Sequence, residues 1–87
     1  MSTGKVQADR DTLKAARIWL RLEQEQLAKA AGLTRETVSN FEGGRTAPHE
    51  STRQKLQEAL EARGIVFSNG NKPGFHYDKD KAIIPKS

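Results

Sequence analysis

The sequence predicts a mainly α-helical fold in which four short helices are followed by a β-hairpin. Three observations lead to this fold class. Apolar residues recur at helical spacing in four segments between residues 11 and 64. Glycine or proline marks the ends of the second, third and fourth segments, at Gly32, Gly43–Gly44, Pro48 and Gly64. After Gly64 the pattern changes to two short β-prone runs with turn-forming residues between them.

The composition restricts the class of protein. The 87 residues suffice for one domain with a thin core. The sequence contains no cysteine, which excludes disulfides and thiolate metal sites and fits a reducing compartment. The polar start MSTGKVQADR lacks the apolar run of a signal peptide, and no stretch approaches the roughly 20 apolar residues of a membrane span. We therefore expect a cytoplasmic protein without a membrane partner.

The chain begins with an arm and a first helix. Residues 1–10 are polar and aperiodic, so we expect a flexible N-terminal arm. Asp11 or Thr12 can cap the helix that follows. Its core-facing positions recur at helical spacing: Leu13, Ala16 and Leu20. Ile18 and Trp19 lie off this face, and we expect another part of the protein to cover them. The candidates are the C-terminal segment and a second subunit; the alternative is that Trp19 stays half-exposed and has no role.

Two helices follow in close succession. One covers residues 24–31 and ends at Gly32, and the next begins near Thr34 and ends at Gly43–Gly44. The residues at their junction suit two helices that meet through a very short turn: Leu27, Ala28, Ala31, Leu33, Val38 and Phe41. Ala28 permits close approach, and Gly32 adopts a left-handed backbone without a Cβ clash. The pattern therefore predicts a helix-turn-helix.

A fourth helix is predicted after a loop. Pro48 prevents a continuous helix through the segment RTAPHE. The helix begins near Ser51, which has capping-box spacing to Gln54. Its apolar positions are Leu56, Ala59 and Leu60. Gly64 is a natural residue just past its C-terminal end.

Residues 65–78 are predicted to form the β-hairpin. The runs IVF and FHY are β-prone, and the Asn, Gly, Lys and Pro residues between them are typical of turns. This loop is longer than a tight two-residue turn, so the sequence leaves the register open. Residues 79–87 form a charged tail in which Ile83–Ile84 is a candidate to dock on the domain.

The stretch LKAARIWLRLEQEQLAKAAGLTRETVSNFEGGR resembles the Cro/repressor-type helix-turn-helix of the XRE family. This resemblance implies a lambda-repressor-like domain in residues 11–64 that binds double-stranded DNA of specific sequence. It also implies a transcriptional regulator, a repressor rather than an activator. The segment GIVFSNGNKPGFHY is similar to the extension of some small bacterial members. Members often have Ser or Thr just before Gln24, where this chain has Glu23; a carboxylate can still cap there but would lie near phosphate.

By the same resemblance, the helix over residues 35–41 is the recognition helix, and its first turns enter the major groove. Four polar residues remain to face outward and to contact bases: Arg35, Glu36, Ser39 and Asn40. Arginine can pair with guanine, asparagine with adenine, and a glutamate can accept from the cytosine amino group. The alternative is that they form only a solvated polar face.

Contacts with DNA phosphates are expected from the ends of the two helices: Gln24, Thr34, Thr37, Gly44 and Arg45. Gln24 opens the second helix, where backbone N–H groups and the side chain can hold a phosphate. Arg45 lies just past the recognition helix, where it can touch the DNA backbone. The alternative for Gln24 is an ordinary polar residue at a helix start.

Arg17 and Glu42 are interpreted as a structural pair. Arg17 lies on the same helical side as Leu13 and Leu20, which is unusual for a charged residue. In the XRE family these two positions commonly hold an arginine and a glutamate. The resemblance therefore implies an ion pair that clamps the first helix to the third.

The sequence contains no motif that indicates an enzyme. His49 and His76 are far apart and lack metal-ligand spacing, and neither a phosphate-binding loop nor a nucleophile elbow is present. We therefore predict a protein that is not an enzyme and uses no metal or cofactor.

The net charge and the length of the predicted recognition helix indicate the partners of the chain. The net charge of +4 is compatible with nucleic acid, although many soluble proteins carry such a charge. One recognition helix covers only a few base pairs, so we expect a homodimer on two half-sites about 34 Å apart. Two alternatives stay open: an antitoxin whose tail docks a toxin partner, and a protein-interaction module that no longer meets DNA.

Overall fold

The computed structural model describes residues 6–45, 49–68 and 73–85. Its elements, in chain order, are α1 (Arg10–Trp19), α2 (Gln24–Ala31), α3 (Arg35–Gly43), α4 (Glu50–Glu61), β1 (Ile65–Ser68), β2 (Gly74–Tyr77) and the 3₁₀ turn η1 (Lys79–Lys81). The four helices and the antiparallel hairpin confirm the predicted fold class. The predicted loop at 46–48 and the hairpin turn at 69–72 lie outside the described residues.

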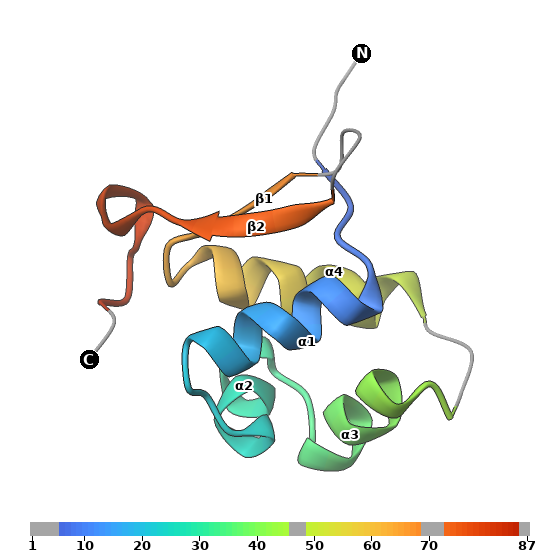
Figure 1. The fold of residues 1–87 in the computed structure, drawn as a ribbon. Helices are drawn as coiled ribbons and strands as arrows, with labels where there is room; N and C mark the ends of the chain where they lie inside the picture. The colour runs from blue at the N-terminus through green and yellow to red at the C-terminus, as the bar shows by residue number, and fades with distance from the viewer. Residues whose placement is uncertain (1–5, 46–48, 69–72, 86–87) are drawn as a thin grey trace.

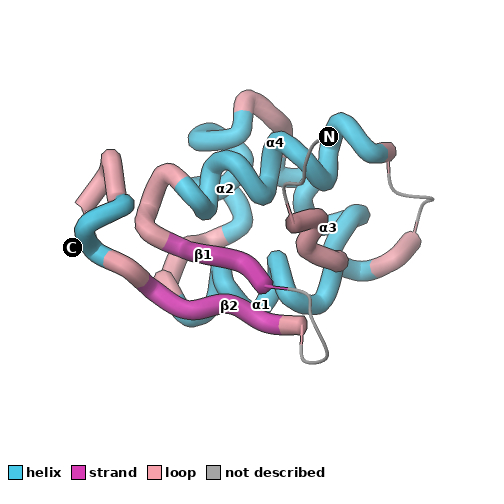
Figure 2. The backbone as a smooth tube through the Cα atoms, turned by 90° about the horizontal axis from the view of Figure 1, so that it is seen from above, coloured by secondary structure: helices cyan, strands magenta, loops and turns pink. Residues whose placement is uncertain are grey.

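The elements form three layers (Figure 1). The hairpin lies on one side of α1 and α4, and α2 and α3 lie on the other. Seen from above, β1 runs on the α4 side and β2 on the α1 side (Figure 2), in agreement with the contacts between α4 and β1 and between α1 and β2. The buried apolar residues form one core: Ala8, Leu13, Ala16, Leu20, Leu27, Ala28, Val38, Phe41, Leu56, Ala59, Leu60, Ile65 and Phe67.

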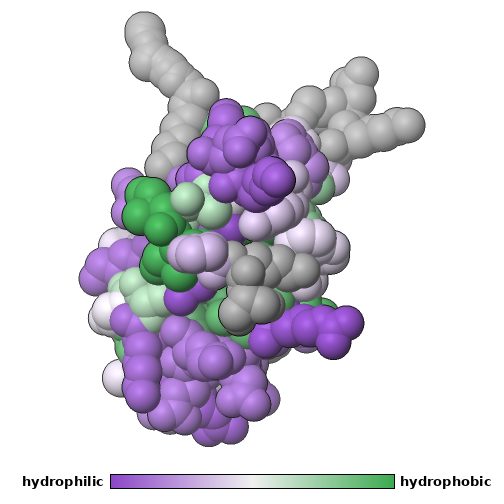
Figure 3. Space-filling model, turned by 90° about the vertical axis from the view of Figure 1, so that its left-hand side faces the viewer, coloured by the Kyte–Doolittle hydropathy of each residue, from purple (hydrophilic) through white to green (hydrophobic). Residues whose placement is uncertain are grey.

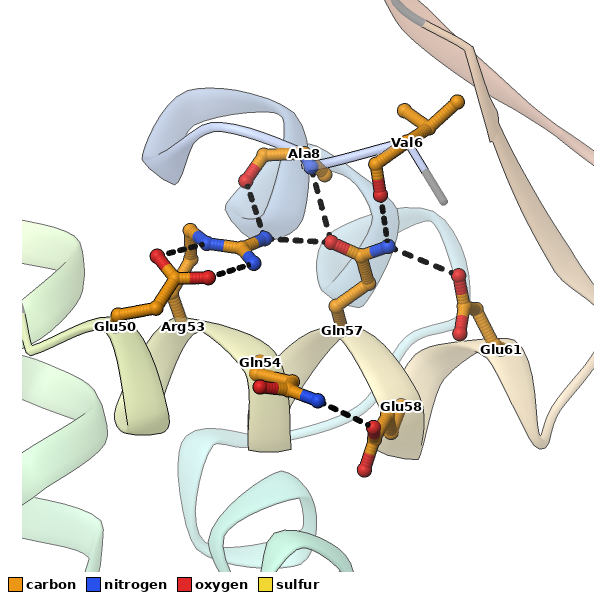
Figure 4. A network of polar contacts seen from close by, with 8 residues as sticks. All are labelled: Val6, Ala8, Glu50, Arg53, Gln54, Gln57, Glu58 and Glu61. Carbon is orange, nitrogen blue, oxygen red and sulfur yellow. Dashed lines mark hydrogen bonds and ion pairs between the residues drawn. The ribbon is translucent and has the colours of Figure 1, made fainter. Parts of the chain in front are cut away.

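The segment before α1 is docked, which corrects the prediction of a flexible arm for residues 6–9. The buried side-chain amide of Gln57 accepts from the N–H of Ala8 at 2.9 Å and donates to the carbonyl of Val6 at 2.6 Å (Figure 4). Arg53 adds a bond to the carbonyl of Ala8 at 3.2 Å. The Gln57 side chain on α4 thus bonds to backbone groups of a segment far away in the sequence. No local pattern in residues 6–9 predicts that this segment is docked.

Two helix starts differ from the prediction. Asp9, not Asp11 or Thr12, caps α1, because its carboxylate accepts from the N–H of Thr12 at 2.8 Å. The N–H and the hydroxyl of Thr12 both bond to this carboxylate, and these two bonds hold the pKa of Asp9 below its ordinary value. Helix α4 begins at Glu50, so Ser51 lies inside its first turn and does not form the predicted capping box.

The hairpin pairs Ile65 with Tyr77 and Phe67 with Phe75, which sets the register that the sequence left open. Phe75 and Tyr77 lie against Trp19, with ring centroids 6.4 and 5.2 Å away. The hairpin therefore supplies the cover predicted for Trp19, although the residue remains 43% exposed.

The tail docks through its backbone. The N–H groups of Ile83 and Ile84 donate to the carbonyl of Ala62 at 2.7 and 3.0 Å, just past the end of α4. The side chain of Ile83 stays exposed, so the docking predicted for this pair does not bury its apolar group. Within the described part of the chain, no helix is both long and apolar enough to cross a bilayer, and no three metal-ligating side chains gather at one place.

Candidate nucleic-acid interface

The turn between α2 and α3 is short and tightly bonded. Gly32 adopts a left-handed backbone with φ of 71°, and the N–H of Leu33 donates to the carbonyl of Ala28 at 2.8 Å. Ala28 and Val38 are buried, so the two helices approach closely through small side chains. This geometry fixes the orientation of α3 relative to α2, which a DNA-reading helix requires.

Both helices begin at well-formed caps. Thr34 caps α3, because its hydroxyl accepts from the N–H of Thr37 at 3.2 Å and lies 2.9 Å from the Thr37 hydroxyl. Glu23 caps α2 in a capping box, in which the side-chain oxygen of Gln26 accepts from the N–H of Glu23 at 2.8 Å. Glu23, which departs from the family pattern, thus keeps the structural role of a cap.

The four predicted base-reading residues lie on the side of α3 that faces away from the core. Val38 and Phe41 point inward and are buried. Arg35 and Glu36 are exposed, and Ser39 and Asn40 are half-buried. The helix lies in the layer farthest from the hairpin (Figure 1), so no other described element covers this outward side.

Arg45 folds back onto α3. Its guanidinium donates to the side-chain oxygen of Asn40 at 3.1 Å. A Cβ at Gly43 would lie 3.6 Å from the Arg45 Nε atom, which is an ordinary contact, so this path does not depend on the glycine. Arg45, which was predicted to contact phosphate, is therefore hydrogen-bonded to Asn40, which was predicted to contact a base. The sequence did not indicate this bond. Asn40 holds the arginine on the outward side of α3.

Arg10 is a further arginine that sequence reasoning missed. Its guanidinium lies over Gly44, where a Cβ would come within 2.7 Å of the Nη1 atom. A cation at this place suits the negative end of the α3 dipole. The N–H of Gly44 itself donates to the carbonyl of Phe41 at 3.2 Å, so this predicted phosphate ligand is already used to end the helix. Only the three-dimensional fold brings Arg10 to this end of α3, so no sequence signal identifies it.

Arg17 and Glu42 form a buried, two-pronged ion pair. Arg17 Nε and Nη2 lie 2.7 and 2.9 Å from the two carboxylate oxygens, and the two side chains are 12% and 4% exposed. Arg17 Nη1 also donates to the carbonyl of Leu22 at 2.7 Å. Gln24 donates to the same carboxylate at 3.0 Å. The side chain of Gln24 therefore braces the pair, and its predicted phosphate contact would have to come from the backbone or from a rearranged side chain.

Comparison with known proteins places this geometry in a family. Residues 13–64 match the helix-turn-helix family; this stretch is most of the described chain and contains α2, α3, α4 and the part of α1 from Leu13 onward. The chain belongs to the XRE-type helix-turn-helix family. This family binds DNA, and the match covers every residue of the α2–turn–α3 unit described above.

The chain is also similar to a protein of Alkaliphilus oremlandii (strain OhILAs) that carries the name competence-damage inducible protein. The two are 26% identical over 53 residues. This stretch is 61% of the present chain and 13% of the relative, so the chain spans about an eighth of that protein's length.

Proposed function

We propose that this XRE-type protein binds double-stranded DNA of specific sequence and regulates transcription, with α3 in the major groove. The outward side of α3 carries the proposal. It presents Arg35 and Glu36 to solvent and holds Arg45 on Asn40, while the helix is fixed to the core through its buried side. Side chains of these types match the donor and acceptor pattern of base edges in the major groove.

The arginines beyond α3 are proposed to set the register on the DNA backbone. Arg45 and Arg10 both reach the C-terminal end of α3, and both are exposed. Guanidinium groups at such places bind phosphate and position the reading helix without contributing sequence information. Thr34 and Thr37, at the opposite end of α3, are proposed to contact phosphate through their hydroxyl groups.

We further propose that the protein acts in the cytoplasm as a homodimeric repressor. A single α3 spans only a few base pairs, and two copies on adjacent half-sites double the length of DNA that is read. Repression requires only that the bound dimer occlude a promoter, whereas activation requires a further contact with the polymerase. The antitoxin alternative would use the same α3 surface together with a toxin partner.

A salt titration of duplex DNA binding tests this function. The logarithm of the binding constant should fall linearly with the logarithm of the salt concentration, because each phosphate contact releases counterions. Arg45→Ala should weaken binding to all sequences alike and reduce the slope by about 1. Lys79→Ala, which removes an exposed cation in η1 on the hairpin side, should leave the slope unchanged. Binding that is absent or insensitive to salt would contradict the proposal.

A further inference from the structure

The outer edge of β2 is open for pairing. The N–H of Asp78 donates to the carbonyl of Gly64 at 2.7 Å, next to the Ile65–Tyr77 pair. Because hydrogen-bonded and non-hydrogen-bonded pairs alternate along antiparallel strands, the backbone groups of Phe75 and Tyr77 point away from β1, toward the outer edge of β2. The outer edge of β1 differs, since Val6, Glu61 and Lys81 line a hollow beside it.

An apolar surface lies beside this edge. Ala15, Ile18 and Trp19 are exposed and recur at helical spacing on the side of α1 that does not face the core. Ile18 is 54% exposed, and Trp19 contacts Phe75 and Tyr77 of β2. The left-hand side of Figure 1, on which α1 ends and the C-terminal tail lies, shows patches of apolar surface among hydrophilic side chains (Figure 3).

The side chains of β2 include no lysine or proline, although the strand has only four residues and directly follows Pro73, and both features limit pairing at an edge. Exposed edge strands of soluble proteins usually carry a lysine, a proline or a charged side chain that prevents pairing with another chain. The four residues of β2, Gly-Phe-His-Tyr, include none of these. On α1, the exposed Asp11 and Lys14 lie one helical turn before Ala15 and Ile18, so the apolar surface of this helix has charged neighbours. The edge and the neighbouring α1 surface therefore have the properties of an interface.

We propose that this interface joins two copies of the chain, with β2 of each copy paired antiparallel to β2 of the other in one four-stranded sheet. One register uses every outward backbone group of Phe75 and Tyr77, because it pairs Phe75 of one copy with Tyr77 of the second. A shift in one direction would use Pro73, which has no N–H, and a shift in the other would enter η1. In the favoured register His76 lies opposite His76 of the second copy.

The proposed symmetry suits the DNA-binding function on which this inference rests. The two-fold axis of such a strand pair is perpendicular to the sheet, and α2 and α3 lie together on one side of the hairpin (Figure 1). Both recognition helices would therefore face the same side of the dimer.

A single engineered cysteine tests the register, because the chain has no cysteine of its own. Residues opposite each other in a non-hydrogen-bonded pair have Cβ atoms about 4.5 Å apart, close to the distance that a disulfide bridges. Mild oxidation of His76→Cys without DNA should give a covalent dimer on a non-reducing gel. Ser68→Cys, which places the cysteine at an exposed position of β1, should give no covalent dimer on the same gel. If His76→Cys cross-links no better than Ser68→Cys, the proposed pairing is wrong.

Substitution of the α1 surface gives an independent measurement. Ile18→Lys should raise the dimer dissociation constant at least tenfold in analytical ultracentrifugation, because it places a charge in the interface. Ile83→Lys, at a more exposed position in the tail, should not change it. Equal dissociation constants for Ile18→Lys and the unmodified protein would overturn the proposal.

DNA binding by the cross-linked dimer separates this inference from the proposed function. Duplex binding that is retained by oxidised His76→Cys supports both. Binding by the reduced form alone would show that the cross-linked geometry is wrong, although the protein binds DNA. A cross-linked dimer would remain evidence for the interface even if neither form bound DNA, in which case the proposed function would fail alone.

Discussion

Among single residues, Glu42 connects the three helices around the helix-turn-helix. Its carboxylate accepts from Arg17 and Gln24, so α1, α2 and α3 meet at one charge. The resemblance to the XRE family implied the pairing with Arg17. The resemblance did not imply the hydrogen bond from Gln24, whose predicted role is a contact with a DNA phosphate. A side chain at a helix start can point to solvent or to the core, and only the packed structure distinguishes the two.

Removal of one partner should be costly. Arg17→Ala leaves the carboxylate of Glu42 buried without its cation, so we expect a loss of about 3–5 kcal/mol in the free energy of unfolding. Asp11→Ala serves as the control, because it removes an exposed carboxylate from the first turn of α1 together with its 3.9 Å contact to the exposed Arg10, and it should cost less than about 1 kcal/mol. Urea denaturation of both variants measures the difference. Equal losses would show that the pair does not hold the helices together.

At the scale of elements, the start of α1 should respond to pH. The N–H and hydroxyl of Thr12 lower the pKa of Asp9 below its ordinary 3.8. A lowered carboxylate pKa adds stability above the unfolded-state pKa, and this stability is lost as the pH falls through the folded-state pKa.

Asp9→Asn keeps the cap but removes the charge. At neutral pH it should reduce the free energy of unfolding by less than about 1 kcal/mol, because Asp9 is exposed and its interaction with the helix dipole is screened. The difference between the two proteins should shrink as the pH falls below about 3.8 and through the folded-state pKa of Asp9. Denaturation curves at neutral pH and across the acid range measure it, and a difference that does not change with pH would exclude this role.

The hairpin depends on Gly64, which joins it to α4. Gly64 has φ of +96°, and a Cβ there would lie 2.8 Å from both the carbonyl oxygen of Asp78 and the ring of Tyr77. Gly32 also has a positive φ but has open space around it. We expect Gly32→Ala to cost about 1–2 kcal/mol for the left-handed backbone alone. Gly64→Ala should cost a further loss of about 1–3 kcal/mol in the free energy of unfolding, because the added Cβ overpacks the junction.

Fluorescence of Trp19 should separate these two effects. Trp19 is the only tryptophan of the chain and contacts both aromatic residues of β2. A hairpin displaced by Gly64→Ala should therefore change its emission, whereas Gly32→Ala should not. Unchanged emission in Gly64→Ala, with a loss of stability no larger than that of Gly32→Ala, would show that the junction tolerates a side chain.

Over the whole molecule, local patterns predicted most of the fold, and long-range contacts account for what they missed. Helix spacing and glycine positions located all four helices, because those signals lie within a few residues of each other. The docking of Ala8 on Gln57 and the approach of Arg10 to Gly44 join distant parts of the chain, so no local pattern contains them. The outward residues of α3 were predictable because helical spacing separates them from Val38 and Phe41.

The central claim is that α3 reads a specific DNA sequence, and selection of bound sites from a randomised duplex pool tests it most directly. We expect the unmodified protein to select a two-fold symmetric consensus. Arg35→Ala should lose the base preference at one pair of symmetric positions and cost about 1–3 kcal/mol in binding free energy, while the other positions keep their preference. A pool that shows no consensus, or a consensus that Arg35→Ala leaves intact, would contradict the account.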